Sequence, residues 1–172
     1  FCDMTVDGSF PMGACVLAAC LIHGIPVPLA LLIAFIAGIL AGLVTTAIYT
    51  KLKIPDLLAG ILTMTMLYSI NLRIMSNKAN VSFLRVQTLF SSITDKMYDI
   101  MPDIDPNWGI VIFLIVFVFI LKIFLDLFFH TDMGLTMGAL GANPQLVISQ
   151  GVNPNTLRTI GICFGNGMAA LA

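Results

Sequence analysis

The chain has 172 residues and a formal net charge of −1, and 59% of its residues are hydrophobic whereas only 10% are charged. A soluble domain has roughly 25% charged and about 45–50% apolar residues, because much of its surface must contact water. The composition therefore excludes an ordinary soluble domain. The near-zero net charge gives no indication of a nucleic-acid partner, which would require a basic patch. We expect an all-α polytopic membrane protein.

Four apolar segments stand out along the chain, and a fifth is begun at its end. Backbone polar groups cannot remain unpaired in lipid, so these segments should be helices. Their irregular apolar runs lack the alternation of a transmembrane barrel strand. The sequence therefore predicts one transmembrane helical bundle with about five spans in the chain. The spans are expected near residues 10–22, 28–49, 57–75, 109–129 and, incomplete, 157–172.

Both ends of the sequence suggest a piece of a longer protein. The chain opens with Phe1 instead of Met, and it closes inside the apolar run Thr159–Ala172. That run is shorter than the roughly 20 residues that a transmembrane helix needs. We therefore expect a fragment of a larger membrane domain.

Small residues recur every four positions in the second span, at Ala34, Gly38 and Gly42. Small side chains at this spacing allow two helix backbones to approach closely within a membrane. The pattern predicts a helix-packing seam and not a ligand site.

The charge of the connecting segments predicts the orientation in the membrane. The tight connection 50–56 carries Lys51 and Lys53, and short basic loops remain in the cytoplasm. The long segment 76–107 is then an external loop, and the segment 130–156 returns to the cytoplasm. Apolar residues recur at helical spacing within the external loop, which predicts an amphipathic helix on the membrane surface or against an extracellular partner. These residues are Val86, Leu89, Phe90, Ile93 and Met97.

Four polar residues in or beside the apolar segments are candidates for a substrate path: Asp7, Ser9, Asn71 and Arg73. Asp7 and Ser9 precede the first apolar run, where either could cap a helix at the interface. Alternatively, a helix broken at membrane depth would direct its positive end at a pathway. Arg73 either snorkels to the headgroups, pairs with a neighbouring polar group, or lines the path. No catalytic or metal-binding residues are predicted, and the four cysteines show no C-x-x-C pairing.

The cytoplasmic segment contains signals for a short helix. Asn143 can act as its N-cap, and Pro144 suits the first helical position. Residues 145–150 continue the helix, and Gly151 fits a C-terminal stop. A short rigid helix between two spans could pass force between a membrane bundle and a soluble partner, although an ordinary ordered loop has the same pattern.

Several segments, in this order and spacing, resemble the permease subunit of bacterial ABC importers, in particular the branched-chain amino-acid and sugar type. The resemblance covers nearly the whole chain. In the cytoplasmic segment it includes a Gly-x-Asn-Pro turn and a later Gly-Val pair, which flank the coupling helix of that family. The segments that carry the resemblance are Asp3–Ala14, Lys53–Thr65, Leu67–Met75, Gly138–Pro144 and Gly151–Val152.

The resemblance implies a subunit of an ATP-driven importer in the bacterial plasma membrane, forming the path of a small solute such as an amino acid. The chain would pair with a second permease copy, two cytoplasmic ATPase subunits and an extracellular substrate-binding protein. It would itself be no enzyme and hold no cofactor, because ATP would bind the ATPase and the chain has no G-x-x-x-x-G-K-[ST] loop. The residues implied to contact the ATPase are Gly141, Asn143, Pro144, Gln145 and Gly151.

Two other functions remain open at this point. An ion-coupled secondary transporter usually has ionisable groups near the membrane midplane, whereas Arg73 and Lys122 lie towards the ends of their spans. A non-catalytic membrane scaffold is the second open function, since a scaffold needs no polar residues in its interior. An intramembrane hydrolase is poorly supported, because the only histidines, His23 and His130, lie at predicted membrane ends.

Overall fold

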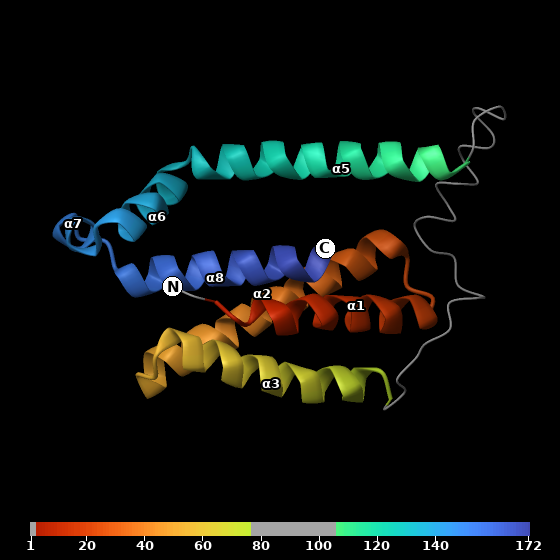
Figure 1. Ribbon diagram of the computed structural model, residues 1–172, viewed down its shortest axis with the longest axis horizontal. Coiled ribbons are helices and arrows are strands. Elements are labelled where there is room, and N and C mark those ends of the chain that lie inside the picture. Colours follow the sequence, from red (N-terminus) through yellow and green to blue (C-terminus); the bar gives the residue numbers. More distant parts are fainter. Residues whose placement is uncertain (1–2, 77–105) are drawn as a thin grey trace.

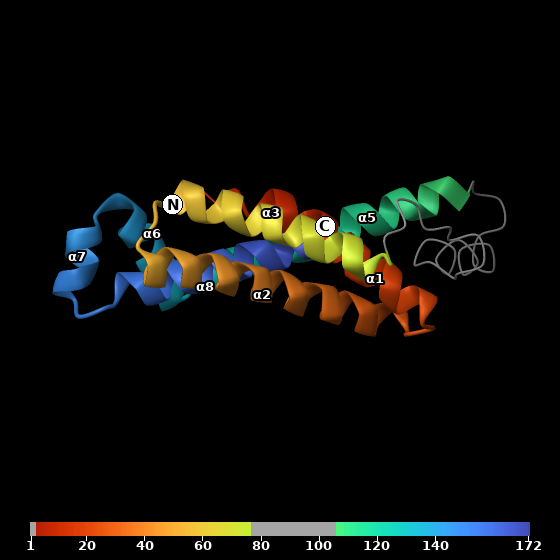
Figure 2. The same ribbon diagram turned by 90° about the horizontal axis from the view of Figure 1, so that it is seen from below.

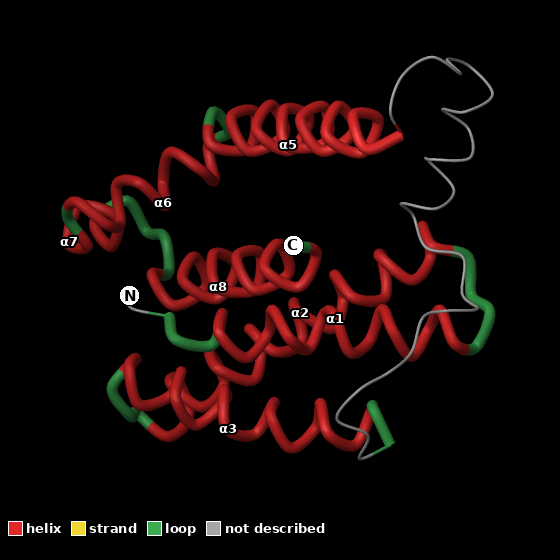
Figure 3. Tube along the Cα trace, turned by 45° about the vertical axis from the view of Figure 1, so that its right-hand side comes forward, coloured by secondary structure: helices red, strands yellow, loops and turns green. Residues whose placement is uncertain are grey.

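The computed structural model describes residues 3–76 and 106–172, and the regular structure within these ranges is entirely α-helical (Figure 1). Short connections join consecutive helices within each range (Figure 3). The helices are α1 (Val6–Ile22), α2 (Val27–Leu52), α3 (Asp56–Ile74), α5 (Pro106–Phe129), α6 (Asp132–Ala142), α7 (Pro144–Ser149) and α8 (Pro154–Leu171).

A four-helix bundle of α1, α2, α3 and α8 forms the centre of the described structure. The most extensive contact joins α2 to α8, and α1 packs against α2, α3 and α8 (Figures 1 and 2). At one end of the bundle, α6 and α7 form a projection that links α5 to α8 (Figure 1). α5 also contacts α8 through stacked rings, with the Phe128 and Phe164 centroids 4.8 Å apart.

The predicted seam of small residues is confirmed as the contact between α2 and α8. A Cβ atom added at Gly38 would lie 2.4 Å from the carbonyl oxygen of Asn166, and one at Gly42 would lie 2.7 Å from the Cα of Cys163. Ala34, the third small residue of the predicted seam, is also buried on α2. The two backbones approach so closely that only glycine fits at these two positions, which is the packing that small-residue repeats permit.

Three of the five predicted spans are long and apolar enough to cross a membrane. These are α2, α3 and residues 108–129 of α5. α1 is an apolar helix of 17 residues and is shorter than the spans, and α8 is not among the candidate spans within the described residues. The structure therefore gives a multi-pass helical membrane fold, while the number of five spans stays a prediction.

Two local expectations are corrected at the start of α1. The helix begins at Val6, four residues before the predicted span, so Asp7 and Ser9 lie in its first turn and do not precede it. The N-cap residue is Thr5, whose backbone N–H donates to Oδ1 of Asp3 at 2.9 Å. Asp7 and Ser9 are therefore not caps. Asp3 orders the backbone just before the helix.

The segment 130–156 also contains more structure than predicted, because α6 occupies part of it. Its three glycines, Gly134, Gly138 and Gly141, lower the intrinsic helix propensity of the segment. For this reason no helix is expected there from the sequence alone. The predicted external amphipathic helix and nearly all of the external loop lie outside the described residues, which omit 77–105.

Candidate functional site

A buried polar network lies inside the bundle and is centred on Asn166 of α8, which is 0% exposed. Ser9 Oγ donates to Asn166 Oδ1 at 2.8 Å. Asn166 Nδ2 donates to Asp3 Oδ2 at 2.6 Å and to the carbonyl oxygen of Ile162 at 2.9 Å. Polar groups in an apolar interior are stable only when hydrogen-bonded, so this network fixes the start of α1 against α8.

A pair of buried threonines extends the polar region to α2. The Oγ1 atoms of Thr5 and Thr45 are 2.8 Å apart, and Thr45 Oγ1 donates to the carbonyl oxygen of Ala41. Thr5 is therefore the donor in the pair. Thr45 lies seven residues before Leu52 at the end of α2, which corresponds to about 10 Å along the helix. The N-terminus of α1, which is its positive end, thus packs against α2 at Thr45.

A cavity of about 550 Å³ lies beside this network, between α1, α6, α7 and α8. Asp3 and Arg158 both line it, so the cavity presents a carboxylate and a guanidinium. Gly141 and Pro144 line it from the α6–α7 side. Its volume falls in the range of about 300–1,000 Å³ that small-molecule sites occupy. The cavity therefore connects the buried polar network to the predicted coupling segment.

The short helix α7 forms with the local geometry that the sequence predicts. Asn143 is its N-cap, and Asn143 Oδ1 accepts from the backbone N–H groups of Gln145 at 3.1 Å and Leu146 at 3.4 Å. Pro144 is the first helical residue. Gly151, just beyond the helix, has φ of +80°, a conformation that glycine adopts without strain.

An apolar cluster anchors α7 to its neighbours. Val147 of α7 is fully buried and packs with Leu140 of α6 and Leu157 of α8. The opposite side of α7 is open, because Leu146 and Ile148 are exposed. A displacement of α7 would therefore be transmitted to α6 and α8 through packed side chains.

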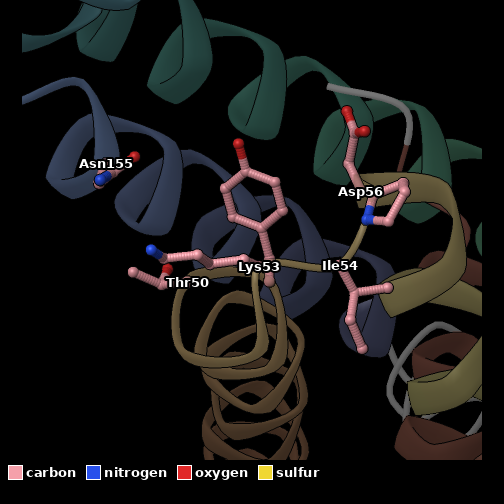
Figure 4. A pocket seen from close by; sticks show the side chains of 7 residues that line it. Thr50, Lys53, Ile54, Asp56 and Asn155 are labelled. Atoms are coloured by element: carbon pink, nitrogen blue, oxygen red, sulfur yellow. The ribbon is translucent and has the colours of Figure 1, made fainter.

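A hollow of about 510 Å³ lies at the turn between α2 and α3 (Figure 4). Lys53, Asp56 and Asn155 are among the side chains that line it. Beside it, Nη1 of Arg158 donates to Oη of Tyr49 at 2.8 Å, which ties α8 to α2. This turn lies at the same end of the bundle as α7 (Figure 1). The basic turn and the short helix therefore share one end of the molecule, as their common assignment to the cytoplasm requires.

The four predicted substrate-path residues are not all brought together. Asp7 and Asn71 line the same groove of about 210 Å³ between α1 and α3. Ser9 is fully buried in the polar network on another side of α1. Arg73 is exposed in the last turn of α3 and lines none of the three hollows described above.

Sequence reasoning missed the other members of the network. Asp3 was not singled out, although it is an ionisable residue directed into the bundle. Asn166 was missed because the incomplete last span was treated as a plain apolar run. A lone Asn within that run was the available signal, since an intramembrane polar residue needs a partner. Within the described residues, no group of three or more His, Cys, Asp or Glu side chains could hold a metal ion.

Helices long and apolar enough to cross a membrane, packed with helices that hold a buried polar network, define a multi-pass membrane protein. The chain belongs to the branched-chain amino acid transport permease family, since the family described as "Branched-chain amino acid transport system / permease component" matches residues 2–172. A tyrosine transport system permease protein of Clostridioides difficile (strain R20291) is 41% identical over 172 residues, covering 100% of this chain and 53% of the relative.

An uncharacterized protein of Rickettsia prowazekii (strain Madrid E) is 37% identical over 169 residues, covering 98% of this chain and 55% of that protein. The chain thus spans about half the length of the curated relatives it matches. No solved structure matches the chain. Members of this family are transport permeases and are typically non-catalytic.

Proposed function

We propose that the chain is part of the permease subunit of an ATP-driven importer in the bacterial plasma membrane, which carries an amino acid or a related compound. The complete protein would pair with a second permease copy, two cytoplasmic ATPase subunits and an extracellular substrate-binding protein. ATP would bind the ATPase subunits. The family membership supports the permease role, and the resemblance described above suggests the ATP-driven assembly.

The observation that carries the proposal is the position of α7. It is anchored through Val147 to both α6 and α8, and it exposes Leu146 and Ile148 at the end of the bundle. Exposed apolar side chains on a short, capped helix suit a groove on a partner protein. Gly141, Asn143, Pro144, Gln145 and Gly151 would form or support this contact with the ATPase.

The packing suggests how a movement of α7 would reach the substrate path. A shift of α7 would move Leu157 at the start of α8 and the cavity wall formed by Gly141 and Pro144. Further along α8, Asn166 holds the Asp3 carboxylate and the Ser9 hydroxyl. Two ATPase states that contact α7 differently would therefore favour two arrangements of this network, as alternating access requires.

An aromatic amino acid is the substrate that we favour. The Clostridioides difficile relative is described as a tyrosine transport system permease protein, and it is 41% identical across this whole chain. The described helices also offer both apolar walls and polar groups, which a zwitterion with an apolar side chain requires.

One observation supports an alternative function, an ion-coupled secondary transporter. Asp3 is a carboxylate inside the bundle, and such groups often bind the coupling ion. Co-purification of the full-length protein with its ATPase distinguishes the two functions. A stable complex whose ATP hydrolysis rises with substrate-loaded binding protein supports the importer. Ion-gradient-driven uptake by the purified protein alone would instead establish the secondary transporter.

Changes at the two ends of α7 should uncouple ATP hydrolysis from transport. Asn143→Ala removes the cap, at a cost of about 1 kcal/mol to the helix. Gly151→Val forces a β-branched residue into φ of +80°, at a cost of roughly 1–3 kcal/mol. We expect binding-protein-stimulated ATP hydrolysis to fall by about fivefold or more, because a misfolded α7 no longer fits the ATPase.

The matched control for these variants is Gln150→Ala, since Gln150 is exposed and contributes only backbone hydrogen bonds to the end of α7. Membrane insertion should be equal in all variants. Normal stimulation in the Asn143→Ala, Gly151→Val double variant would contradict the coupling role of α7.

A further inference from the structure

The cavity between α1, α6, α7 and α8 has walls of two kinds. Asp3 and Arg158 are its charged lining residues, and every other residue that lines it is apolar or glycine. A site of this composition suits a ligand that carries charged groups and an apolar body. The apolar side chains come from all four helices and belong to Val6, Met137, Leu140, Pro144, Leu157 and Ile162.

The two charged groups of the cavity are half-buried and have only neutral hydrogen-bond partners among the described residues. Asp3 accepts from the backbone N–H of Thr5 at 2.9 Å and from Asn166 at 2.6 Å. Arg158 donates through Nη1 to the hydroxyl of Tyr49 at 2.8 Å. The guanidinium keeps further N–H donors on Nε and Nη2, and the carboxylate oxygens keep further lone pairs. Because charges without an opposite partner are costly within a membrane protein, a ligand with both charges would neutralise both groups.

The carboxylate of Asp3 lies near the turn of α8 that follows Arg158. Asn166 Nδ2 donates both to the carbonyl oxygen of Ile162 and to Asp3 Oδ2, so the carboxylate is beside the Ile162 turn. Arg158 precedes Ile162 by four residues, which corresponds to about 6 Å along the helix axis. In a free α-amino acid one carbon atom joins the ammonium to the carboxylate, and a charge-assisted hydrogen bond of about 2.7–2.9 Å at each end bridges a gap of this size.

Glycines on the cavity wall leave room for the body of such a ligand. Among the described residues, a Cβ atom added at Gly141 or Gly165 would meet nothing within 4 Å, and one at Gly161 would meet only Met137 Sδ at 3.9 Å, apart from the helix itself and its chain neighbours. Gly38 differs, because its added Cβ would lie 2.4 Å from the carbonyl oxygen of Asn166. The cavity glycines are therefore not needed for close helix packing, and they keep space open.

We propose that this cavity binds a free α-amino acid with an apolar or aromatic side chain. The ammonium group pairs with Asp3, the carboxylate accepts from Arg158, and the side chain packs against the apolar walls of α6 and α8. The site rests on the proposed permease function, because it would form part of the solute path. Gly141 and Pro144 line the same cavity, so a movement of α7 would act directly on the bound amino acid.

Three related compounds test whether both charges are recognised. The experiment uses the full-length protein in lipid nanodiscs without phosphatidylethanolamine, and it measures the displacement of tritiated L-phenylalanine. Phenethylamine lacks the carboxylate of phenylalanine, and hydrocinnamate lacks the ammonium group. We expect each of them to require at least about tenfold higher concentration than unlabelled phenylalanine, because each loses one set of charge-assisted hydrogen bonds.

Charge variants should remove one of these preferences at a time. In Arg158→Gln, phenethylamine should displace the label as well as phenylalanine does, because the carboxylate has lost its partner. In Asp3→Asn, hydrocinnamate should likewise become equal to phenylalanine. A merely structural role of either residue would weaken all three compounds together and leave the preferences unchanged. That result would contradict the assigned contacts.

Filling variants test whether binding takes place in this cavity. Gly165→Leu should weaken phenylalanine binding at least about tenfold, because the leucine side chain and the ligand compete for the same close-packed volume. The melting temperature should not fall, since the space at Gly165 is open and leucine favours the helix. Gly161→Leu, one turn earlier on the same wall, should act in the same way. Gly138→Leu is the matched control, because Gly138 has equally open space on α6 and does not line the cavity.

Three results would overturn the site. The first is equal displacement by all three compounds, and the second is unchanged binding in both filling variants. The third is a melting temperature lowered by both filling variants, which would show that the cavity is not open. If phenylalanine does not bind and phosphatidylethanolamine raises the melting temperature, the cavity instead holds that lipid headgroup, which also carries an ammonium and an anion. None of these results affects ATPase co-purification, so failure of the site and failure of the proposed importer function are distinguishable.

Discussion

Gly13→Ala is expected to destabilise the bundle by about 3 kcal/mol, at the upper end of the usual cost of overpacking. A Cβ atom at Gly13 would lie 2.0 Å from the carbonyl oxygen of Ala170 and 2.7 Å from its Cα. Both atoms belong to the backbone of α8, so no side-chain rotation can relieve the overlap. The two helices must separate, and the hydrogen bond between Ser9 and Asn166 lies on the same pair of helices.

Gly165→Ala is the matched control for this prediction. Gly165 lies on α8, and nothing lies within 4 Å of a Cβ atom added there, apart from the helix itself and its chain neighbours. Alanine is favoured over glycine in a helix by about 0.5–1 kcal/mol, so this variant should be neutral or stabilised. Thermal unfolding of the full-length protein in mild detergent measures both effects. Equal melting temperatures for the two variants would show that α1 and α8 do not pack as described.

Asn166→Asp is expected to destabilise the bundle about as much as Gly13→Ala does, but by a different mechanism. It removes the Nδ2 donor that Asp3 and Ile162 accept, and it places a second carboxylate where Asn166 Nδ2 now lies 2.6 Å from Asp3 Oδ2. Two carboxylates at this separation cannot both remain ionised at low cost. We expect a destabilisation of about 3 kcal/mol and loss of transport, since breaking a buried polar pair leaves an uncompensated charge.

Adding Asp3→Asn to the Asn166→Asp variant should recover much of the stability that Asn166→Asp removes. The new amide at position 3 keeps an oxygen for the Thr5 N–H and supplies a donor to the new carboxylate at position 166. The Ser9 hydroxyl can still donate to that carboxylate. A double-mutant cycle on melting temperatures should give a coupling energy of about 1–3 kcal/mol. Additive effects of the two substitutions would contradict the contact between positions 3 and 166.

Local signals were sufficient for the elements that depend on local chemistry. The cap at Asn143, the proline at position 144 and the glycine at position 151 each act within one turn of α7, and the structure confirms all three. The long apolar runs of α2, α3 and α5 likewise define helices without tertiary information. By contrast, α6 is rich in glycine and packs against α5, α7 and α8, so tertiary contacts outweigh its weak propensity.

The candidate substrate residues show where local reasoning stops. Asp7 and Ser9 are two residues apart, and so are Asn71 and Arg73, and residues at this spacing point to different sides of a helix. Only one of each pair could therefore face a given groove. The sequence does not say which one, because the choice depends on where the neighbouring helix packs. In the structure Asp7 and Asn71 both line the groove between α1 and α3, whereas Ser9 donates to Asn166.

The sequence by itself determined the class of this protein, its family and the positions of most helices, because hydropathy and capping act over a few residues. Only the tertiary structure brought Asp3 and Ser9 to Asn166, which is 163 and 157 positions away along the chain. It also showed that the Oδ1 atom of Asn71 is buried without a hydrogen-bond partner among the described residues. No local sequence pattern encodes such long-range contacts, because each one depends on which face of a helix its neighbour packs against.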